Sequence, residues 1–275
     1  MNSGDGYKEM WEDFAFRKKK VYLDAKFNPI HSNGFKNYLR ERTLMSFLDM
    51  GKDDVFLDVG CASGRQVFLA ALYCQRAVGI DIASGFVEVA RSFAAGRGIK
   101  NVEFYAAPAE SLPFNDHTFS KVLCAETLEH VLEPRGVLRE IRRVLRPGGL
   151  LTITVPNKNG QATLWGRTKR FLSRRRFEPM REFSLSEIER HGDAHLREYD
   201  VKIIGASLEG EGYTIQRIRG ASFIDFPFAD KVINRLNRVP FIRAFLTGLE
   251  ETLGSFERMT RWGRHLVVAS RAKKC

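Results

Sequence analysis

The sequence lacks the features that mark several large protein classes. Its 275 residues include only four cysteines, Cys61, Cys74, Cys124 and Cys275, with no CxxC pair and no spacing typical of a disulfide framework or a metal site. No apolar run approaches the roughly 18 residues that a membrane-spanning helix needs. Met1–Lys20 also has no apolar core of a signal peptide. These absences favour a reducing compartment, and we expect a cytoplasmic protein with no bound metal.

Acidic residues are in short supply. The chain has 33 Asp and Glu against 44 Lys and Arg, a formal net charge of +11. Residues 156–177 contain no acid, and residues 231–274 contain ten basic residues and three acids. Such a balance favours an anionic partner but does not specify a fold. Three interpretations stay open for these stretches: an amphipathic, basic surface that associates with anionic lipid, an RNA-binding surface, or a solvated substrate lid.

Residues 55–64 are the stretch around which the chain is organised. Apolar residues lead to Asp58, a turn follows with Gly60 and Gly64, and the next ten residues lack Gly and Pro. This pattern predicts a strand, a turn and a helix, and open α/β sheets bind ligands at the carboxyl ends of their strands. Asp58 would repel a phosphate and attract a cationic amino acid. Asp81, 23 residues later, ends the next apolar run, where a carboxylate can bind ribose hydroxyls.

The motifs of this stretch resemble those of the Rossmann-like S-adenosylmethionine-dependent methyltransferases. The resemblance lies in Asp58-x-Gly60-Cys61-x-x-Gly64 and in the strand that ends at Asp81. Residues 110–114, 129–131 and 145–149 fit the same family, in the right order. The resemblance is strong over residues 36–155 and points to the small-molecule or quinone-biosynthesis type. It implies a doubly wound, mostly parallel seven-stranded α/β sheet with an antiparallel last strand.

The order of elements leads to the same fold independently, because short apolar runs alternate with helical segments. We expect strands over 55–58, 77–81, 102–106, 122–125, 150–155, 213–219 and 265–270, and helices over 35–50, 65–74, 84–97, 134–145 and 200–211. Ser84 is expected to cap the third of these helices. About 45 residues separate the last two strands, too many for a bare loop, which predicts an inserted helical cap broken by Pro227 and Pro240.

The expected domain organisation follows from these boundaries. Residues 1–35 form an N-terminal helical segment that either lies over the ligand cleft or packs on the edge of the domain. Residues 36–275 form the methyltransferase domain, with a basic insert at 156–198 and a cap insert at 220–262. Arg40 and Arg42 lie on the first helix of this domain. In related enzymes a basic side chain of this helix can bind the methionine carboxylate, and otherwise such arginines belong to a solvated helix face.

The resemblance implies S-adenosylmethionine as cofactor and assigns residues to it. Asp58 and the turn residues Gly60, Cys61, Ala62 and Gly64 would hold the methionine half, with backbone carbonyls of Cys124 and Ala125 accepting from its ammonium group. Asp81 would accept from both ribose hydroxyls, although it could instead cap a helix. Ile82, Ala109 and Glu110 would contact the adenine.

Two positions depart from the family pattern. Ala62 replaces the usual middle glycine of the turn, which is tolerable if its φ stays negative. Pro108 stands where many relatives carry an Asp that accepts from the adenine amino group. We therefore expect Glu110, or backbone and packing alone, to hold the adenine.

The candidate catalytic residues are Glu126, His130 and His195. Glu126 follows the fourth strand, and His130 lies four residues further, where it is either a base or a structural residue of the loop. His195 belongs to a His-Leu-Arg-Glu-Tyr stretch that many small-molecule methyltransferases carry near the acceptor. A metal held by His191, Asp193 and His195 lacks a fourth ligand, so no metal is predicted.

The function expected from the sequence is S-adenosylmethionine-dependent O-methylation of a small, lipid-linked or glycan-type acceptor. An anionic membrane surface is the second expected partner, and nucleic acid is the less favoured one. The alternatives are an RNA methyltransferase and a non-catalytic module that binds S-adenosylmethionine or docks a partner.

Overall fold

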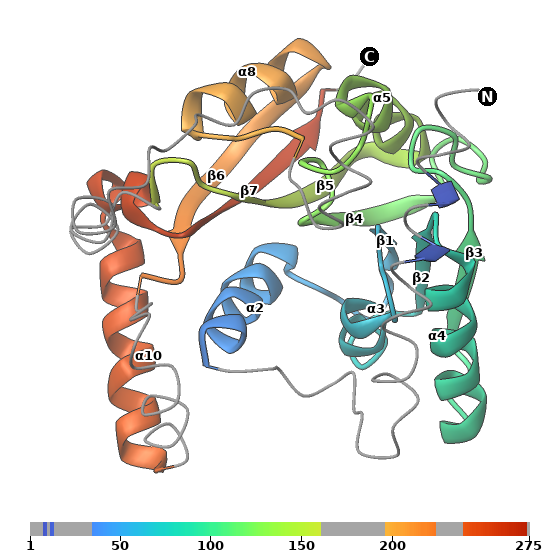
Figure 1. The fold of residues 1–275 in the computed structure, drawn as a ribbon, viewed down its shortest axis with the longest axis horizontal. Coiled ribbons are helices and arrows are strands. Elements are labelled where there is room, and N and C mark those ends of the chain that lie inside the picture. Colours follow the sequence, from blue (N-terminus) through green and yellow to red (C-terminus); the bar gives the residue numbers. More distant parts are fainter. Residues whose placement is uncertain (1–7, 10–11, 14–34, 161–195, 224–238, 274–275) are drawn as a thin grey trace.

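Seven strands form a single sheet in the order β3-β2-β1-β4-β5-β7-β6 (Figure 1). The computed structural model describes residues 8–9, 12–13, 35–160, 196–223 and 239–273. β1 to β5 are parallel, and β7 runs antiparallel to both of its neighbours, β5 and β6. This topology confirms the predicted fold class. The strands are β1 Val55–Val59, β2 Arg76–Asp81, β3 Val102–Ala106, β4 Phe119–Ala125, β5 Leu145–Pro156, β6 Tyr213–Ala221 and β7 His265–Ala272.

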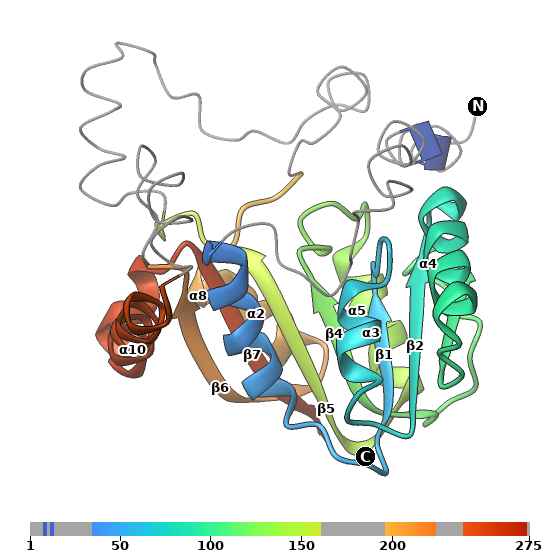
Figure 2. The same cartoon turned by 90° about the horizontal axis from the view of Figure 1, so that it is seen from below.

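Helices cover both faces of the sheet (Figures 1 and 2). On one face lie α2 Phe35–Leu48, α3 Arg65–Ala70 and α4 Ser84–Arg97, and on the other lie α5 Pro134–Val144 and α8 Val201–Gly210. Side chains alternate along each strand, so Phe56 and Leu123 pack under the first set of helices while Leu57 and Val122 pack under the second. The core is therefore two apolar layers separated by the sheet.

Some element boundaries differ from the sequence prediction. α5 ends at Val144, and β5 starts at Leu145 rather than at residue 150, because Leu145 pairs with Phe119 before an irregularity in the ladder. Ser84 does not cap α4: it is the first helical residue, Ala83 is the N-cap, and no side-chain cap bond is present there. The end of α4 is as expected, with Gly98 at φ 64°.

The insert between β6 and β7 contains α10 Pro240–Ser255 and the 3₁₀ helix η2 Glu257–Trp262. Pro240, expected to break the cap, instead occupies the first turn of α10, where its missing N–H costs nothing. Pro227 and most of the basic insert at 156–198 lie outside the described residues, as does most of the N-terminal segment. Within the part of the chain described, none of the helices combines the length and the apolar character needed to cross a bilayer.

Candidate cofactor and acceptor site

The turn after β1 has the tight backbone that its glycines predicted. Gly60 and Gly64 have φ of 79° and 83°, and the amides of Gly60 and Cys61 donate to the carbonyl oxygen of Ile80 at 2.8 and 2.9 Å. A Cβ atom on Gly60 would lie 2.3 Å from Oγ1 of Thr127. Glycine is therefore required at this position by the approach of the loop after β4 as well as by its φ.

Ala62 does not satisfy the condition set for it. Its φ is 44°, in the left-handed region that L-residues other than Gly, Asn and Asp rarely adopt. The amide of Ala62 donates to Oδ2 of Asp81 at 2.8 Å. The condition of a negative φ is thus not met, and this hydrogen bond holds the turn in a conformation that the family's usual glycine would adopt without strain.

Asp81 connects the turn to the start of α4. Its Oδ1 accepts from the amide of Ala83 at 2.9 Å, while its Oδ2 accepts from Ala62. Asp81 is not the helix N-cap that the sequence offered as its alternative role, because Ala83 is the N-cap of α4 and the amides of Ser84 and Gly85 donate to Glu12. Each carboxylate oxygen still has a second lone pair, so the same group can accept from ribose hydroxyls. Burial raises the pKa of Asp81 to about 6, against opposing backbone hydrogen bonds from Ala83 and Ala62.

Asp58 is a buried acid beneath the same turn. Its Oδ2 has no hydrogen-bond partner among the described residues, and the side chain is only 2 % exposed. Burial, and then the charge of Asp81, raises the pKa of Asp58 to about 8. An orphaned buried acceptor calls for a donor, and a cationic group bound at the turn would supply one. This buried acceptor thus fits the ammonium-bearing half of S-adenosylmethionine, which supplies N–H donors.

The side chains of the two predicted cysteines are buried in the core. The thiols of Cys61 and Cys124 are buried in opposite apolar layers of the core, and burial raises the pKa of both. Ala109 also packs against the core. Ile82 and Glu110 are half-buried, directly after β2 and in the segment after β3.

Glu126 contacts three elements, α2, β5 and β7, near the turn after β1. Its Oε1 accepts from Oγ1 of Thr154 on β5 at 2.9 Å. Its Oε2 lies 3.2 Å from a guanidinium nitrogen of Arg40 on α2 and 3.4 Å from Nε2 of His265 on β7. The backbone of Glu126 has φ 52°, so the residue directs its side chain from a strained turn. Arg40 therefore binds a protein carboxylate in this structure.

Glu129 is the site residue that the sequence analysis missed. Its side chain is fully buried, and neither carboxylate oxygen has a hydrogen-bond partner among the described residues. Burial, followed by the charge of Glu126, raises the pKa of Glu129 well above its ordinary value. The Glu-His pair at 129–130 was a visible signal, but only His130 was selected from it.

His130 is half-buried, and its amide donates to the carbonyl oxygen of Thr127, which closes the loop after β4.

The chain returns to this loop at residues 196–199. The amide of Leu196 donates to the carbonyl oxygen of Glu129 at 2.8 Å, and the guanidinium of Arg197 donates to Leu132 at 2.7 Å. The Tyr199 hydroxyl donates to the carbonyl oxygen of Leu128 at 3.3 Å. His195 itself, like His191 and Asp193, lies outside the described residues. Among the residues that are described, no group of three His, Cys, Asp or Glu could hold a metal ion.

Comparison with known proteins identifies the central part of the chain. Residues 57–153 match a family model described as a methyltransferase domain, Methyltransf_11. The methyltransferase YcgJ of Bacillus subtilis is 39 % identical over 93 residues, 34 % of this chain and 37 % of that protein. The ubiquinone biosynthesis O-methyltransferase of Parvibaculum lavamentivorans is 33 % identical over 146 residues, 50 % of this chain and 57 % of that protein. The chain thus spans between about a third and three fifths of the length of these curated relatives.

Solved structures extend the likeness to nearly the whole chain. The YcgJ crystal structure aligns with a TM-score of 0.54 at 19 % identity, over 85 % of this chain and 98 % of that one. A complex between the Haloferax volcanii Trm112 methyltransferase activator and a candidate methyltransferase aligns with a TM-score of 0.62 at 14 % identity, over 98 % of both chains. At these identities the likeness shows the fold, which is that of the Rossmann-like methyltransferases.

Proposed function

Because residues 57–153 form a methyltransferase domain of the class that uses S-adenosylmethionine, we propose that the protein methylates an oxygen atom of a small, lipid-linked or glycan-type acceptor. One observation carries this proposal. Two buried carboxylates, Asp58 and Glu129, lie on β1 and in the loop after β4, at the same edge of two neighbouring strands. Among the described residues, Oδ2 of Asp58 and both carboxylate oxygens of Glu129 have no hydrogen-bond partner. The first suits the cationic cofactor, and the second suits an acceptor that must lose a proton.

The residues around the turn would hold the cofactor. Asp58 accepts from a cationic donor, the carboxylate of Asp81 accepts from the ribose hydroxyls, and Ile82 and Glu110 border the adenine. S-adenosylmethionine supplies a methyl group already activated by a positively charged sulfur. The protein therefore needs to align the acceptor, exclude water and take up a proton, and alignment of this kind can contribute roughly 7–11 kcal/mol.

Glu129 is the general base in this proposal. Burial, followed by the charge of Glu126, raises its pKa well above the ordinary value, so this carboxylate binds a proton more strongly than an exposed glutamate does. Glu126 is less suited, since Arg40, Thr154 and His265 already occupy its carboxylate. Glu126 would instead act as a positioning residue that maintains the charge beside Glu129. His195 stays a candidate on the acceptor side, because Leu196 contacts the Glu129 loop.

The acceptor class rests on the relatives and on the surface charge. Two of the curated relatives, from Parvibaculum and Vibrio, are named for O-methylation in ubiquinone biosynthesis, which favours an acceptor with a lipid tail. The net charge of +11 supports a cytoplasmic enzyme that works at an anionic membrane surface. The same charge favours RNA as the second candidate, and the structural neighbour paired with Trm112 raises a protein activator as a possible partner.

Transfer of a labelled methyl group would test the proposal. Purified protein, labelled S-adenosylmethionine and an extract of its source cells are incubated, and the lipid, small-molecule, nucleic-acid and protein fractions are counted. Label in lipid or in small molecules is expected. Label in nucleic acid would replace this proposal by RNA methylation. Cofactor binding with no transfer into any fraction would favour a non-catalytic module, and absence of cofactor binding would overturn the assignment altogether.

Glu129→Gln would test the proposed base. We expect the rate of transfer to fall by about 10²–10⁴-fold, with the affinity for S-adenosylmethionine unchanged in calorimetry. Glu133→Gln is the matched control, since Glu133 is exposed four residues away in the same segment and its side chain makes no capping bond. A Glu129→Gln protein as active as the control would rule out the general-base role.

A further inference from the structure

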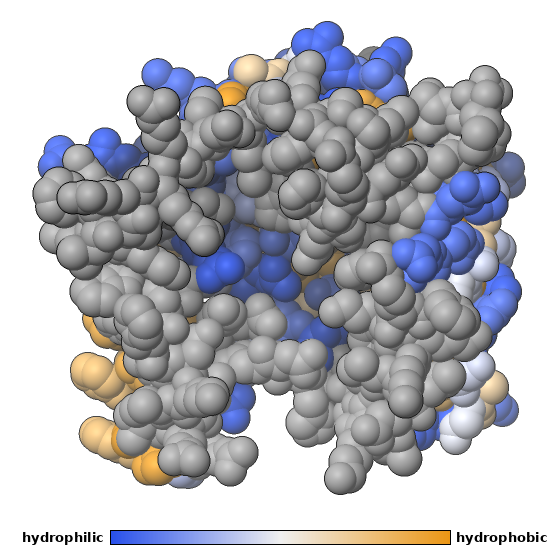
Figure 3. Space-filling view, in the orientation of Figure 1, coloured by the Kyte–Doolittle hydropathy of each residue, from blue (hydrophilic) through white to orange (hydrophobic). Residues whose placement is uncertain are grey.

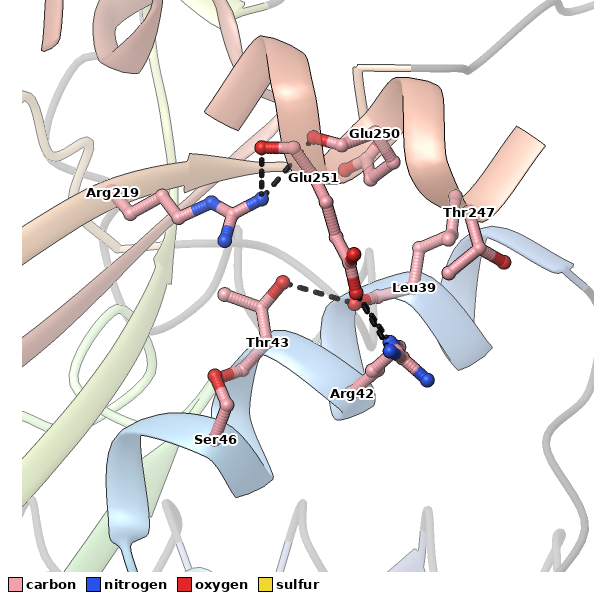
Figure 4. A pocket seen from close by; sticks show the side chains of 8 residues that line it. All are labelled: Leu39, Arg42, Thr43, Ser46, Arg219, Thr247, Glu250 and Glu251. Carbon is pink, nitrogen blue, oxygen red and sulfur yellow. Dashed lines mark hydrogen bonds and ion pairs between the residues drawn. The ribbon is translucent and has the colours of Figure 1, made fainter. Parts of the chain in front are cut away.

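The helix α10 exposes large apolar side chains, while its charged residues contact neighbouring elements. Its charged residues point toward the rest of the protein, as Figure 4 shows for the two glutamates. Glu251 pairs with Arg42 of α2 at 2.7 Å. Glu250 is buried, and its carboxylate accepts from the amide of Phe223 at 3.0 Å. Arg243 lies over the ring of Tyr38, with 4.2 Å between the guanidinium carbon and the ring centre.

Polar contacts also fill the seam between α10 and its neighbours. A pocket of about 140 Å³ lies between α2, β6 and α10, lined by Arg42, Thr43, Arg219 and Thr247 among others (Figure 4). The Arg219 guanidinium donates to the carbonyl oxygens of Glu250 and Glu251, near the C-terminus of α10. This pocket lies at the β6 edge of the sheet, four strands from β1, so it is separate from the cofactor turn. The seam fixes one side of α10 and leaves the other side facing outward.

The outward side of α10 carries no charge. Phe241 is 80 % exposed, Phe245 62 % and Leu249 40 %, at intervals of four residues that place them in one row along the helix. We define the outer face of α10 as this row with its exposed neighbours Ala244, Gly248 and Thr252. In Figure 3 hydrophobic surface is visible at the lower left, where Figure 1 places α10. A row of exposed large apolar side chains of this kind marks an interaction surface.

Exposed basic and aromatic residues follow α10 in the chain, at its C-terminal end. Arg258, Arg261 and Arg264 are exposed in the segment that follows the helix. Phe256 and Trp262 are also exposed, and the guanidinium carbon of Arg261 lies 5.5 Å from the ring centre of Trp262. Exposed Phe and Leu on one side of α10, followed by a segment with exposed Trp and Arg, have the composition of a structure that lies in a lipid interface. Arginines there attract anionic headgroups.

On this basis we propose that the outer face of α10 docks the protein on an anionic phospholipid surface, with Phe241, Phe245 and Leu249 inserted below the headgroups. The proposal rests on the proposed function only in that a lipid-linked acceptor would be reached there. A second copy of the chain fits less well. The outer face, residues 241–252, is about 18 Å long and roughly 10 Å wide, on the order of 200 Å², whereas a stable dimer buries about 800 Å² on each partner.

Vesicle flotation of the full-length protein would test this surface. We expect wild type to float with vesicles of phosphatidylcholine and phosphatidylglycerol at 3:1, and much less with phosphatidylcholine alone. Substitution of Phe241, Phe245 and Leu249 by Ser together should lower the bound fraction at least ten-fold. Leu72→Ser is the matched control, because Leu72 is an equally exposed apolar side chain (65 %) after α3. Its binding should equal that of wild type.

Three results would overturn the proposal. The first is that wild type floats with neither kind of vesicle. The second is that the triple variant and wild type float equally well. The third is that light scattering finds a dimer for wild type and a monomer for the triple variant. Insertion is checked with Phe245→Trp, whose fluorescence should be quenched by brominated lipid, and an unquenched signal would contradict it. S-adenosylmethionine binding is measured on the same samples. Because α10 is separate from the turn after β1, a variant that loses vesicle binding but still binds S-adenosylmethionine tests the membrane-docking proposal separately from the proposed function.

Discussion

The buried carboxyl group of Asp58 should couple cofactor binding to the release of a proton. With a pKa of about 8, its carboxyl group is mostly protonated in the free protein between pH 6 and 7.5. A cationic group bound beside it favours the ionised form, so binding should release up to one proton in this range. Affinity for S-adenosylmethionine should therefore rise with pH, by up to about ten-fold per unit. Calorimetry in phosphate and in Tris, whose ionisation enthalpies differ, measures the proton release.

Asp58→Asn removes the group that titrates, and its proton release should be smaller by that one proton. Asp53→Asn is the matched control, since Asp53 is exposed in the loop before β1. If wild type and Asp58→Asn released equal numbers of protons, Asp58 would not face the cationic part of the ligand. Asp81, with its pKa of about 6, adds release mainly at the acidic end of the range.

The residue roles that sequence could predict are those fixed by position along the chain. Asp58 and Asp81 were identified because each ends an apolar run, and the structure places both at one edge of the sheet. Their assignment to the cofactor stays a prediction. Whether a buried side chain lacks a hydrogen-bond partner depends on contacts distant in sequence. This property could therefore not be predicted for Glu129, whose surroundings include Glu126 and the returning residue Leu196.

At the scale of elements, the turn after β1 stores strain at one position. A left-handed non-glycine residue costs about 1–2 kcal/mol, while glycine costs roughly 0.5–1 kcal/mol in lost backbone freedom. Ala62→Gly should therefore stabilise the free protein by about 0.5–1 kcal/mol, a rise in melting temperature of about 2 °C. Ala71→Gly is the control: Ala71 ends α3 with φ −58°, so glycine should destabilise there. A lower melting temperature for Ala62→Gly would show that the turn is not strained.

Element order could be predicted from sequence more fully than element ends. Apolar runs of four to six residues, alternating with helical segments, were enough to place all the strands of the sheet. The early start of β5 was not visible, because its pairing with Phe119 crosses an irregular ladder. The cap of α4 was also unpredictable, since its acceptor comes from Glu12, 72 residues away.

At the scale of the whole molecule, Glu12 links the N-terminal segment to the start of α4. Its carboxylate accepts from the amides of Ser84 at 2.8 Å and Gly85 at 3.3 Å, at the start of α4. Burial opposes its ionisation, but these two donors hold the pKa of Glu12 below its ordinary value. Asp81, directly before this helix, is close enough for the charge of Glu12 to raise its pKa. This contact provides a place to test the two interpretations of residues 1–35, a lid over the ligand cleft or a segment packed on the edge of the domain.

Removal of this link should weaken cofactor binding without unfolding the domain. Glu12→Ala leaves two amides at the start of α4 without their acceptor, although water can reach a half-buried site, so the helix should lose at most about 1 kcal/mol. If the segment closes over bound S-adenosylmethionine, the dissociation constant should rise at least three-fold and cofactor release should quicken in stopped flow. Glu9→Ala is the matched control, because Glu9 is exposed in the same segment. Equal release rates for the two variants would show that the segment only packs on the edge of the domain, the other interpretation of residues 1–35.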